Sequence, residues 1–252
     1  MININEIFAG IEGEGLLKGE PSIFIRTQGC SIQCPFCDTK HSWKETEENM
    51  SEEDILKKVQ SLFDSFPSCK NISITGGNPT EQDLRNLVEM LRPFCNENLI
   101  WIKLEHPGIF YYDYLNSGSS ISDEELDLLN KFDFISFDIK SPSFVGNKIE
   151  DLKVPEVIEN LDEKYPIHIW EIKYVFRTKE DVNYFKSVLR SHSMLGDDPT
   201  LGVSIVVNPC TNIDGTLVVD DFTVNYMADF IMKERVGNIR LGVQLHKVLN
   251  LK

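Results

Sequence analysis

The sequence predicts an α/β fold with a mainly parallel sheet, formed by one domain of 252 residues. Short β-branched or aromatic segments alternate with amphipathic segments along most of the chain, a pattern typical of right-handed strand–helix–strand units. No Pro-rich linker, internal repeat or low-complexity tract divides it. A chain of this size buries roughly 73% of its surface on folding, enough for one core without disulfide or metal staples. Six or seven strands are expected, too few for a closed eight-stranded barrel, so the sheet is either a partial barrel or doubly wound.

Each strand is expected where β-branched and aromatic residues cluster between turn residues. In chain order the expected strands cover residues 22–27, 71–75, 99–105, 132–140, 168–176, 201–207 and 239–245. In either arrangement of the sheet, chemistry collects in the loops after the carboxyl ends of the strands. A cluster of three cysteines, the Gly76-Gly77 turn, Glu105 and Lys140 all lie at such ends.

Helices are expected between the strands. Ser51 opens the first through a Ser-x-x-Asp54 capping box. Its predicted inward stripe consists of Ile55, Leu56, Val59, Leu62, Phe63 and Phe66. The second is expected to begin at Thr80, with Leu84, Leu87, Val88 and Leu91 inward. Further helices are expected at residues 122–129, 155–164, 179–190 and 220–235.

The charge balance argues against several function classes. There are 40 Asp and Glu residues against 25 Lys and Arg, for a formal net charge of −15. Such a surface repels phosphate backbones, so neither nucleic acid nor an anionic membrane is expected as a partner. There is no run of 18 apolar residues, and the first ten residues lack a basic segment followed by an apolar one. We therefore expect a soluble cytoplasmic protein.

Three of the six cysteines, Cys30, Cys34 and Cys37, crowd into the loop after the first predicted strand. Closely spaced soft thiolates favour zinc, Cu(I) or an iron–sulfur cluster. A structural zinc site needs four ligands, and no second Cys or His pair follows at the usual spacing. Three ligands leave one metal position open, which suits a catalytic site; a zinc knuckle completed by His41 or by a distant cysteine is the alternative. The remaining cysteines, Cys69, Cys95 and Cys210, are expected to be small buried hydrophobic residues.

The Cys-x3-Cys-x2-Cys spacing, with Phe36 before the third cysteine, resembles the signature of the radical S-adenosylmethionine enzymes. Gly76-Gly77-Asn78-Pro79 is similar to the Gly-Gly-Glu-Pro turn of that family. The resemblance implies a single-domain partial (β/α)6-type barrel. It also implies that the three thiolates hold a 4Fe-4S cluster with one open iron. In that family S-adenosylmethionine binds the open iron and is cleaved to methionine and a 5′-deoxyadenosyl radical.

Motifs at both ends of the chain are similar to those of one family of radical S-adenosylmethionine enzymes, the 7-carboxy-7-deazaguanine synthases. The matching segments are Glu6-Ile7-Phe8, Glu12-Gly13-Glu14-Gly15, Phe24-Ile25-Arg26, Cys37-Asp38-Thr39, Trp43, Leu104-Glu105-His106-Pro107-Gly108 and Gln244-Leu245-His246-Lys247. The resemblance implies contraction of 6-carboxy-5,6,7,8-tetrahydropterin to 7-carboxy-7-deazaguanine with loss of ammonia, a step of 7-deazapurine (queuosine) biosynthesis.

The same resemblance assigns the site residues. Contacts to the pterin substrate are implied for Glu12, Gly13, Glu14, Arg26, Thr75 and His246. Contacts to S-adenosylmethionine are implied for Phe36, Cys37, Asp38, Gly77, Glu105, Asp138, Ile139 and Lys140. Thr39 matches the position at which the family binds Mg²⁺ through a hydroxyl. The chemistry of the side chains agrees, because a carboxylate such as Glu14 accepts from the guanidine-like edge of a pterin and Arg26 can clasp the substrate carboxylate.

Three positions depart from the family pattern. Glu12 replaces a frequent Gln and adds a negative charge near an anionic substrate unless it pairs or protonates. Asn78 replaces the usual Glu of the Gly-Gly-Glu-Pro turn. Asp138-Ile139-Lys140 replaces a frequent Ser-Pro-Lys, so the assignment of Lys140 is the firmer one.

Two other functions fit the cysteine loop. One is a small radical enzyme that activates a glycyl-radical partner, and the other is a zinc-binding interaction module without catalysis. The family resemblance further implies a homodimer, an external reductant such as flavodoxin, and a substrate pocket to which the N-terminal segment and the C-terminal tail contribute. Tyr111, Tyr112 and Tyr114 are expected in loop packing or at a dimer surface.

Overall fold

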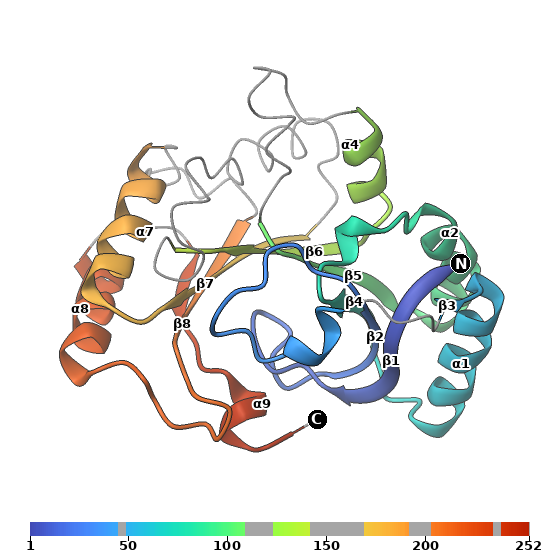
Figure 1. Ribbon diagram of the computed structural model, residues 1–252, viewed down its shortest axis with the longest axis horizontal. Coiled ribbons are helices and arrows are strands. Elements are labelled where there is room, and N and C mark those ends of the chain that lie inside the picture. The colour runs from blue at the N-terminus through green and yellow to red at the C-terminus, as the bar shows by residue number, and fades with distance from the viewer. Residues whose placement is uncertain (45–48, 109–122, 142–168, 192–202, 234–237, 252) are drawn as a thin grey trace.

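The computed structural model shows an open, curved sheet with helices along its outer side (Figure 1). It describes residues 1–44, 49–108, 123–141, 169–191, 203–233 and 238–251. Within these ranges the sheet has nine strands in the order β3-β1-β2-β4-β5-β6-β7-β8-β9. The strands are β1 (Ile2–Ile11), β2 (Pro21–Thr27), β3 (Asn49–Met50), β4 (Asn71–Gly76), β5 (Trp101–His106), β6 (Phe134–Ile139), β7 (Ile169–Phe176), β8 (Val203–Pro209) and β9 (Ile239–Leu241).

From β2 to β9 every neighbouring pair is parallel and the strands follow one another in chain order. In a doubly wound sheet the order of the strands reverses at one point, and the parallel strands here show no such reversal. The prediction of a mainly parallel partial barrel is therefore confirmed. The seven strands of the parallel part match the expected six or seven. β1 pairs antiparallel with β2 on one side and with β3 on the other. The sequence-based interpretation missed β1.

The helices fall mostly where the hydrophobic spacing predicts them. They are α1 (Glu52–Ser65), α2 (Arg85–Asn98), α4 (Asp123–Leu129), α7 (Lys179–Ser191), α8 (Asp221–Lys233) and α9 (Leu245–Val248), with short 3₁₀ turns at Lys40–Ser42 and Pro79–Glu81. Ser51 caps α1 as predicted, since its side chain accepts a hydrogen bond from the Asp54 amide. The expected helix at 155–164, the residue Ser122 and the three tyrosines lie outside the described residues.

Four boundaries were predicted wrongly. Phe66 lies beyond the end of α1 and is 52% exposed, so it does not extend the inward stripe. Leu99 ends α2 in a left-handed conformation at φ 56° and is 83% exposed, so β5 begins only at Trp101. Thr80 lies in a 3₁₀ turn and α2 starts at Arg85. The last strand ends at Leu241, and the segment after it turns into α9.

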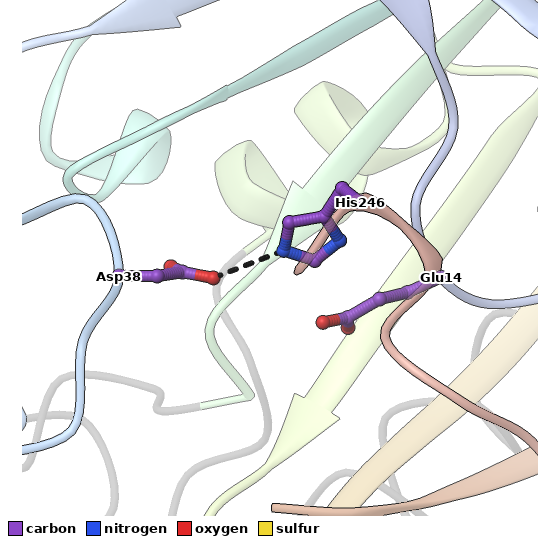
Figure 2. Close-up of side chains that lie close together, drawn as sticks. All are labelled: Glu14, Asp38 and His246. Carbon is purple, nitrogen blue, oxygen red and sulfur yellow. Dashed lines mark hydrogen bonds and ion pairs between the residues drawn. The ribbon is translucent and has the colours of Figure 1, made fainter. Parts of the chain in front are cut away.

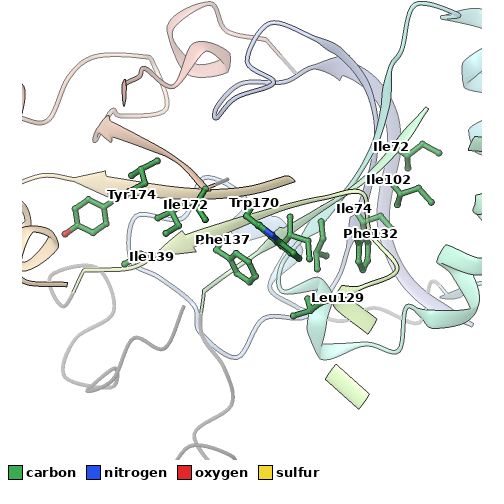
Figure 3. Packing of buried hydrophobic residues seen from close by; sticks show 14 of the residues in the cluster. Ile72, Ile74, Ile102, Leu129, Phe132, Phe137, Ile139, Trp170, Ile172 and Tyr174 are labelled. Carbon is green, nitrogen blue, oxygen red and sulfur yellow. The ribbon is translucent and has the colours of Figure 1, made fainter. Parts of the chain in front are cut away.

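The two faces of the central strands differ sharply in polarity. Their apolar side chains pack outward against the helices, where Figure 3 shows Ile72, Ile74, Ile102, Phe137, Trp170 and Ile172 together with Leu129 and Phe132. The alternate positions carry Ser73, Thr75, Lys103, Glu105, Ser136, Asp138, Glu171 and Lys173. Because successive side chains of a strand point to opposite faces, these polar residues share the inner face of the barrel. The core therefore lies outside the sheet and the chemistry inside it.

Candidate active site

A cavity of about 680 Å³ opens at the carboxyl ends of the parallel strands. All the residues assigned by motif line it: Glu12, Gly13, Glu14, Arg26, Cys30, Cys34, Phe36, Cys37, Asp38, Thr39, Thr75, Gly77, Glu105, Asp138, Ile139, Lys140 and His246. The structure thus brings together side chains that are up to 234 residues apart in the sequence, from Glu12 to His246. The volume of the cavity falls in the range of small-molecule and cofactor sites, roughly 300–1,000 Å³.

The cysteine loop forms one wall of this cavity. Cys30, Cys34 and Cys37 are free, partly exposed thiols. Burial raises the pKa of the Cys34 thiol to about 11, and the neighbouring Cys37 and Cys30 add to this, while Lys140 opposes it. Without a metal, a thiol with such a raised pKa stays protonated. Coordination by a metal removes the thiol proton, so the loop fits the thiolate ligands of an iron–sulfur cluster.

The other three cysteines do not join the loop. Cys69 and Cys95 lie in the hydrophobic core, as expected. Cys210 is also buried and packs on the core, but it reaches the cavity wall as well. The described residues therefore offer a compact set of three soft ligands, which leaves one iron of a 4Fe-4S cluster open.

The Gly76-Gly77 turn passes the cysteine loop at close range. Gly76 has φ +145°, and a Cβ on Gly77 would lie 2.1 Å from the Gly29 carbonyl oxygen. The Asn78 amide donates to that same carbonyl oxygen at 2.7 Å. The Asn78 side chain points away from the cavity: it accepts from the Thr80 amide at 3.1 Å and donates to Glu81 at 3.0 Å. Asn78 therefore shapes the turn, which explains why a departure from Glu is tolerated here.

Asp138, in the last part of β6, and Lys140, directly after that strand, line the cavity and form an ion pair with each other. The second carboxylate oxygen of Asp138, Oδ1, is buried and has no hydrogen-bond partner among the described residues. Burial raises the pKa of Asp138, partly offset by Lys140. A buried acceptor without a partner requires a donor, and the hydroxyl groups of a nucleoside supply donors of that kind. These residues thus fit S-adenosylmethionine.

Glu14, Asp38 and His246 also line the cavity, and their side chains converge (Figure 2). One ligand atom from each lies within 4.8 Å of the others. Asp38 Oδ2 lies 3.3 Å from His246 Nε2 and 3.5 Å from the Lys247 ammonium. Burial raises the pKa of Asp38, but these two partners outweigh it and hold that pKa well below the usual range. Asp38, assigned to S-adenosylmethionine by motif, thus lies beside residues assigned to the substrate.

Arg26 reaches the cavity from β2. Its Nε donates to the Glu6 carboxylate at 3.0 Å, and its guanidinium lies 5.7 Å from the centre of the Phe8 ring. Thr75 is its register partner on β4. The Thr39 hydroxyl lies 3.4 Å from Cys37 Sγ, and Thr39 also lines the cavity. A single hydroxyl suits Mg²⁺, which keeps waters and accepts further oxygens from a substrate.

Glu12 is placed differently from the other residues assigned to the substrate. Its carboxylate is buried and pairs with the Lys103 ammonium at 3.0 Å, and it accepts from Ser22 Oγ at 3.2 Å. The negative charge that this position adds is therefore neutralised inside the barrel rather than facing an anionic substrate.

Two buried lysines of the cavity region are not predicted by the motifs. Lys103 and Lys173 each lie 2.6 Å from a different oxygen of Glu105. The usable signal was the alternation of charged and apolar residues along 101–106 and 169–174, since a charge at an alternate strand position faces the barrel interior.

The comparisons with known proteins agree with this site. A family model described as Radical SAM superfamily matches residues 24–166. The 7-carboxy-7-deazaguanine synthase of Buchnera aphidicola subsp. Schizaphis graminum is 30% identical over 99% of this chain and 98% of its own length. That of Clostridium acetobutylicum is 27% identical, over 97% of this chain and 94% of its own. That of Halobacterium salinarum is 44% identical, but over 32% of this chain and 30% of its own length.

A solved structure supports the fold. The crystal structure of QueE from Escherichia coli superposes with a TM-score of 0.61 at 22% sequence identity, covering 97% of this chain and 94% of that one. The match of a superfamily model to more than half of the chain, together with a full-length relative at 30% identity, is decisive. The chain belongs to the radical S-adenosylmethionine superfamily and, within it, to the 7-carboxy-7-deazaguanine synthase family.

Proposed function

We propose that the protein is a radical S-adenosylmethionine lyase that converts 6-carboxy-5,6,7,8-tetrahydropterin to 7-carboxy-7-deazaguanine with release of ammonia. Atoms and electrons balance, because the product equals the substrate less one ammonia and no net oxidant is needed. The observation that carries the proposal is that a single cavity is lined by both the cysteine loop and the paired motifs of the chain's two ends. A glycyl-radical activase or a zinc module has no need of the second set.

At the cofactor end, Cys30, Cys34 and Cys37 would hold the 4Fe-4S cluster, and the cluster with S-adenosylmethionine supplies the radical chemistry when bound. Gly77 packs against the backbone of the cysteine loop, where no side chain fits, and its main chain lines the cavity and is available to the methionine moiety. The unpartnered oxygen of Asp138 accepts from the nucleoside, and Lys140 supplies positive charge near Cys34. Phe36, Glu105 and Ile139 complete that wall.

At the substrate end, the Glu14 carboxylate accepts from the N–H edge of the pterin. One of its oxygens, Oε1, accepts a hydrogen bond from the Gln244 side-chain amide at 2.7 Å. Arg26 would exchange its partner Glu6 for the carboxylate of the substrate, and the Thr39 hydroxyl would hold Mg²⁺, which would supply positive charge to the anionic substrate. Thr75, His246 and the backbone of Glu12 and Gly13 close the pocket. The Glu12 side chain does not face the substrate but holds this part of the chain in place through its buried ion pair with Lys103.

The chain is further proposed to be one domain over residues 1–252. Support comes from the meeting of its two ends, where the Leu245 amide donates to the Gly13 carbonyl oxygen at 2.8 Å. We propose a homodimer that works in the cytoplasm and takes electrons from a flavodoxin-type reductant. No helix in the described ranges is both long and apolar enough to cross a membrane.

Anaerobic reconstitution tests the proposal. Protein loaded with about four iron and four sulfide per chain should form 7-carboxy-7-deazaguanine from the pterin, S-adenosylmethionine and dithionite. The Cys34→Ala variant is the control and should bind less iron and form neither product nor 5′-deoxyadenosine. Wild-type protein that cleaves S-adenosylmethionine but never converts the pterin would refute the proposed substrate. One tightly held zinc in place of the cluster would refute the reaction class.

A further inference from the structure

We infer that Lys173 is a positioning residue for the pterin, because it fixes the Glu14 carboxylate in the cavity through a chain of buried ion pairs. The inference rests on the proposed function in one respect, the contact between Glu14 and the substrate. It concerns a residue of β7 that no motif assigns.

Five charged side chains alternate in sign along this chain of ion pairs. Glu12 pairs with Lys103 at 3.0 Å, and Lys103 pairs with Glu105 at 2.6 Å. Glu105 in turn lies 2.6 Å from Lys173, which lies 3.6 Å from Glu14. The chain of pairs therefore starts and ends in one short N-terminal segment. It ties both carboxylates of that segment to the inner face of β5 and β7.

Burial makes these contacts matter. The Lys103 side chain is 1% exposed and that of Lys173 is 10% exposed. A surface ion pair contributes little, whereas removal of one partner of a buried pair leaves an uncompensated charge. Burial alone would raise the pKa of Glu14, but Lys173 and then His246 outweigh it, and the pKa is lowered. The carboxylate therefore stays an acceptor for the donors at the pterin edge.

A second residue of β7 holds the same segment by its backbone. Glu171 accepts from Ser136 Oγ at 2.7 Å and from the Leu16 amide. A Cβ on Gly15 would lie 2.3 Å from Glu171 Oε1, so the segment lies directly on this carboxylate. Glu171 and Lys173 are two positions apart and share one face of the strand. Together they fix residues 14–16: Glu171 acts on the main chain and Lys173 on the side chain.

The test compares two matched neutral variants, Lys173→Met and Lys103→Met. Both remove a buried ammonium from Glu105, but only Lys173 contacts Glu14. Both variants should lose thermal stability. Only Lys173→Met should raise the KM for the pterin, by about tenfold or more, the factor that corresponds to about 1.4 kcal/mol of binding. Its kcat, its cluster absorbance and its cleavage of S-adenosylmethionine without pterin should stay within about threefold of wild type.

A double-mutant cycle asks whether Lys173 acts through Glu14. Glu14→Gln should raise the KM for the pterin, and adding Lys173→Met should raise it no further. Lys173→Arg keeps the charge and should restore most of the affinity. Lys173→Gln serves if Lys173→Met does not fold.

Several outcomes would overturn the inference. Equal KM values for Lys173→Met and Lys103→Met, or additive effects in the cycle, would leave Lys173 a structural residue only. The role of Lys173 would likewise be structural if neither of its neutral variants folds while Lys103→Met does. Wild-type protein that never converts the pterin would instead refute the proposed function, and the inference would fall with it. Conversion by wild type with an unchanged KM in Lys173→Met refutes the inference alone.

Discussion

Gly13 packs against the imidazole of His246 and leaves no room for a side chain. A Cβ there would lie 2.1 Å from His246 Nδ1 and 2.6 Å from Cγ. Gly13 also accepts the hydrogen bond from the Leu245 amide, next to the hydrogen bond from Gln244 to Glu14, so the C-terminal tail and the N-terminal segment pack together around this residue. An added methyl group must push the imidazole away from Asp38 and Glu14.

Gly13→Ala should therefore raise the KM for the pterin by about tenfold, a loss of about 1.4 kcal/mol of binding, with little change in cluster content. Steady-state kinetics with the reconstituted protein measure this. Gly19→Ala is the control: it lies in the same segment at φ +94° with no atom within 4 Å of its Cβ position. It should lower stability through backbone strain and leave the KM unchanged. Equal KM values for the two variants would contradict the steric argument.

The burial of His106 leads to a separate prediction about how the stability of the protein depends on pH. It is fully buried against Phe137, with ring centres 5.0 Å apart, and its Nδ1 accepts from the Gly108 amide at 3.0 Å. Burial lowers its pKa to about 3. The pKa of a histidine in the unfolded chain is about 6.5. At pH values below this and above the pKa in the folded protein, the unfolded chain binds a proton at His106 that the folded protein does not. This residue's contribution to stability is thus complete above pH 6.5 and falls as the pH falls.

Urea unfolding of wild type should show stability falling between about pH 6.5 and 4.5, by up to about 1.4 kcal/mol per pH unit from this one group. His106→Asn keeps an acceptor for the Gly108 amide and should flatten that slope. His41→Asn is the control, since the His41 side chain is 55% exposed, and should keep the wild-type slope. Parallel slopes for wild type and His106→Asn would refute the assignment.

At this scale the motifs predicted which residues meet, but not what each one touches. The spacing of Cys30, Cys34 and Cys37 predicts a shared ligand set, because the three residues are near neighbours in the sequence. The pairing of Lys103 with Glu12 spans 91 positions, and that of Lys173 with Glu105 spans 68. Such contacts depend on strand order, which local sequence does not specify. The same holds for Asn78, whose side chain turns into its own loop.

Among the elements, α1 offers a direct measure of local sequence control. Ser51 Oγ accepts from the Asp54 amide at 3.2 Å and donates to the Asp54 carboxylate at 2.9 Å. Ser51→Ala removes both bonds and should lower the free energy of unfolding by about 1 kcal/mol.

Ser61→Ala, the same change at an exposed position inside α1, is the matched control. It should be neutral or slightly stabilising, because Ala is the better helix former. Denaturant titrations of both variants measure the difference. An equal loss in both would mean that the cap contributes nothing.

The boundaries of helices and strands could be predicted only where nearby residues alone determine them, such as a capping side chain or the hydrophobic spacing of a helix. The helical stripe identified α1 and α2, but Leu99 shows how an apolar residue next to a strand can instead end the helix in a left-handed conformation. β1 escaped detection because it is an antiparallel partner of β2, outside the strand–helix alternation that announces the rest. The short α9 follows a strand of only three residues, so no period was long enough to separate the two.

The whole molecule has a formal net charge of −15, while the buried carboxylates of Glu12 and Glu105 are paired with the ammonium groups of Lys103 and Lys173. Surface charges of one sign repel one another and are screened by salt, while buried pairs are screened much less. Raising NaCl from about 20 mM to about 300 mM at pH 8 should therefore raise the melting temperature by a few degrees. Near pH 4.8, where the sequence carries no net charge, the same salt step should have almost no effect. A melting temperature that falls with salt at pH 8 would refute the argument.

The hydrogen bond between Leu245 and Gly13 imposes an order on assembly. The cysteine loop ends at Cys37, so Leu245 leaves the ribosome 208 residues later, which takes roughly 10–40 s at ordinary rates of synthesis. During that interval the thiols are already displayed while the pocket wall that carries His246 does not yet exist. Iron and sulfide that arrived during synthesis would therefore meet cysteines that the C-terminal tail does not yet cover, and the tail would close the pterin pocket only afterwards.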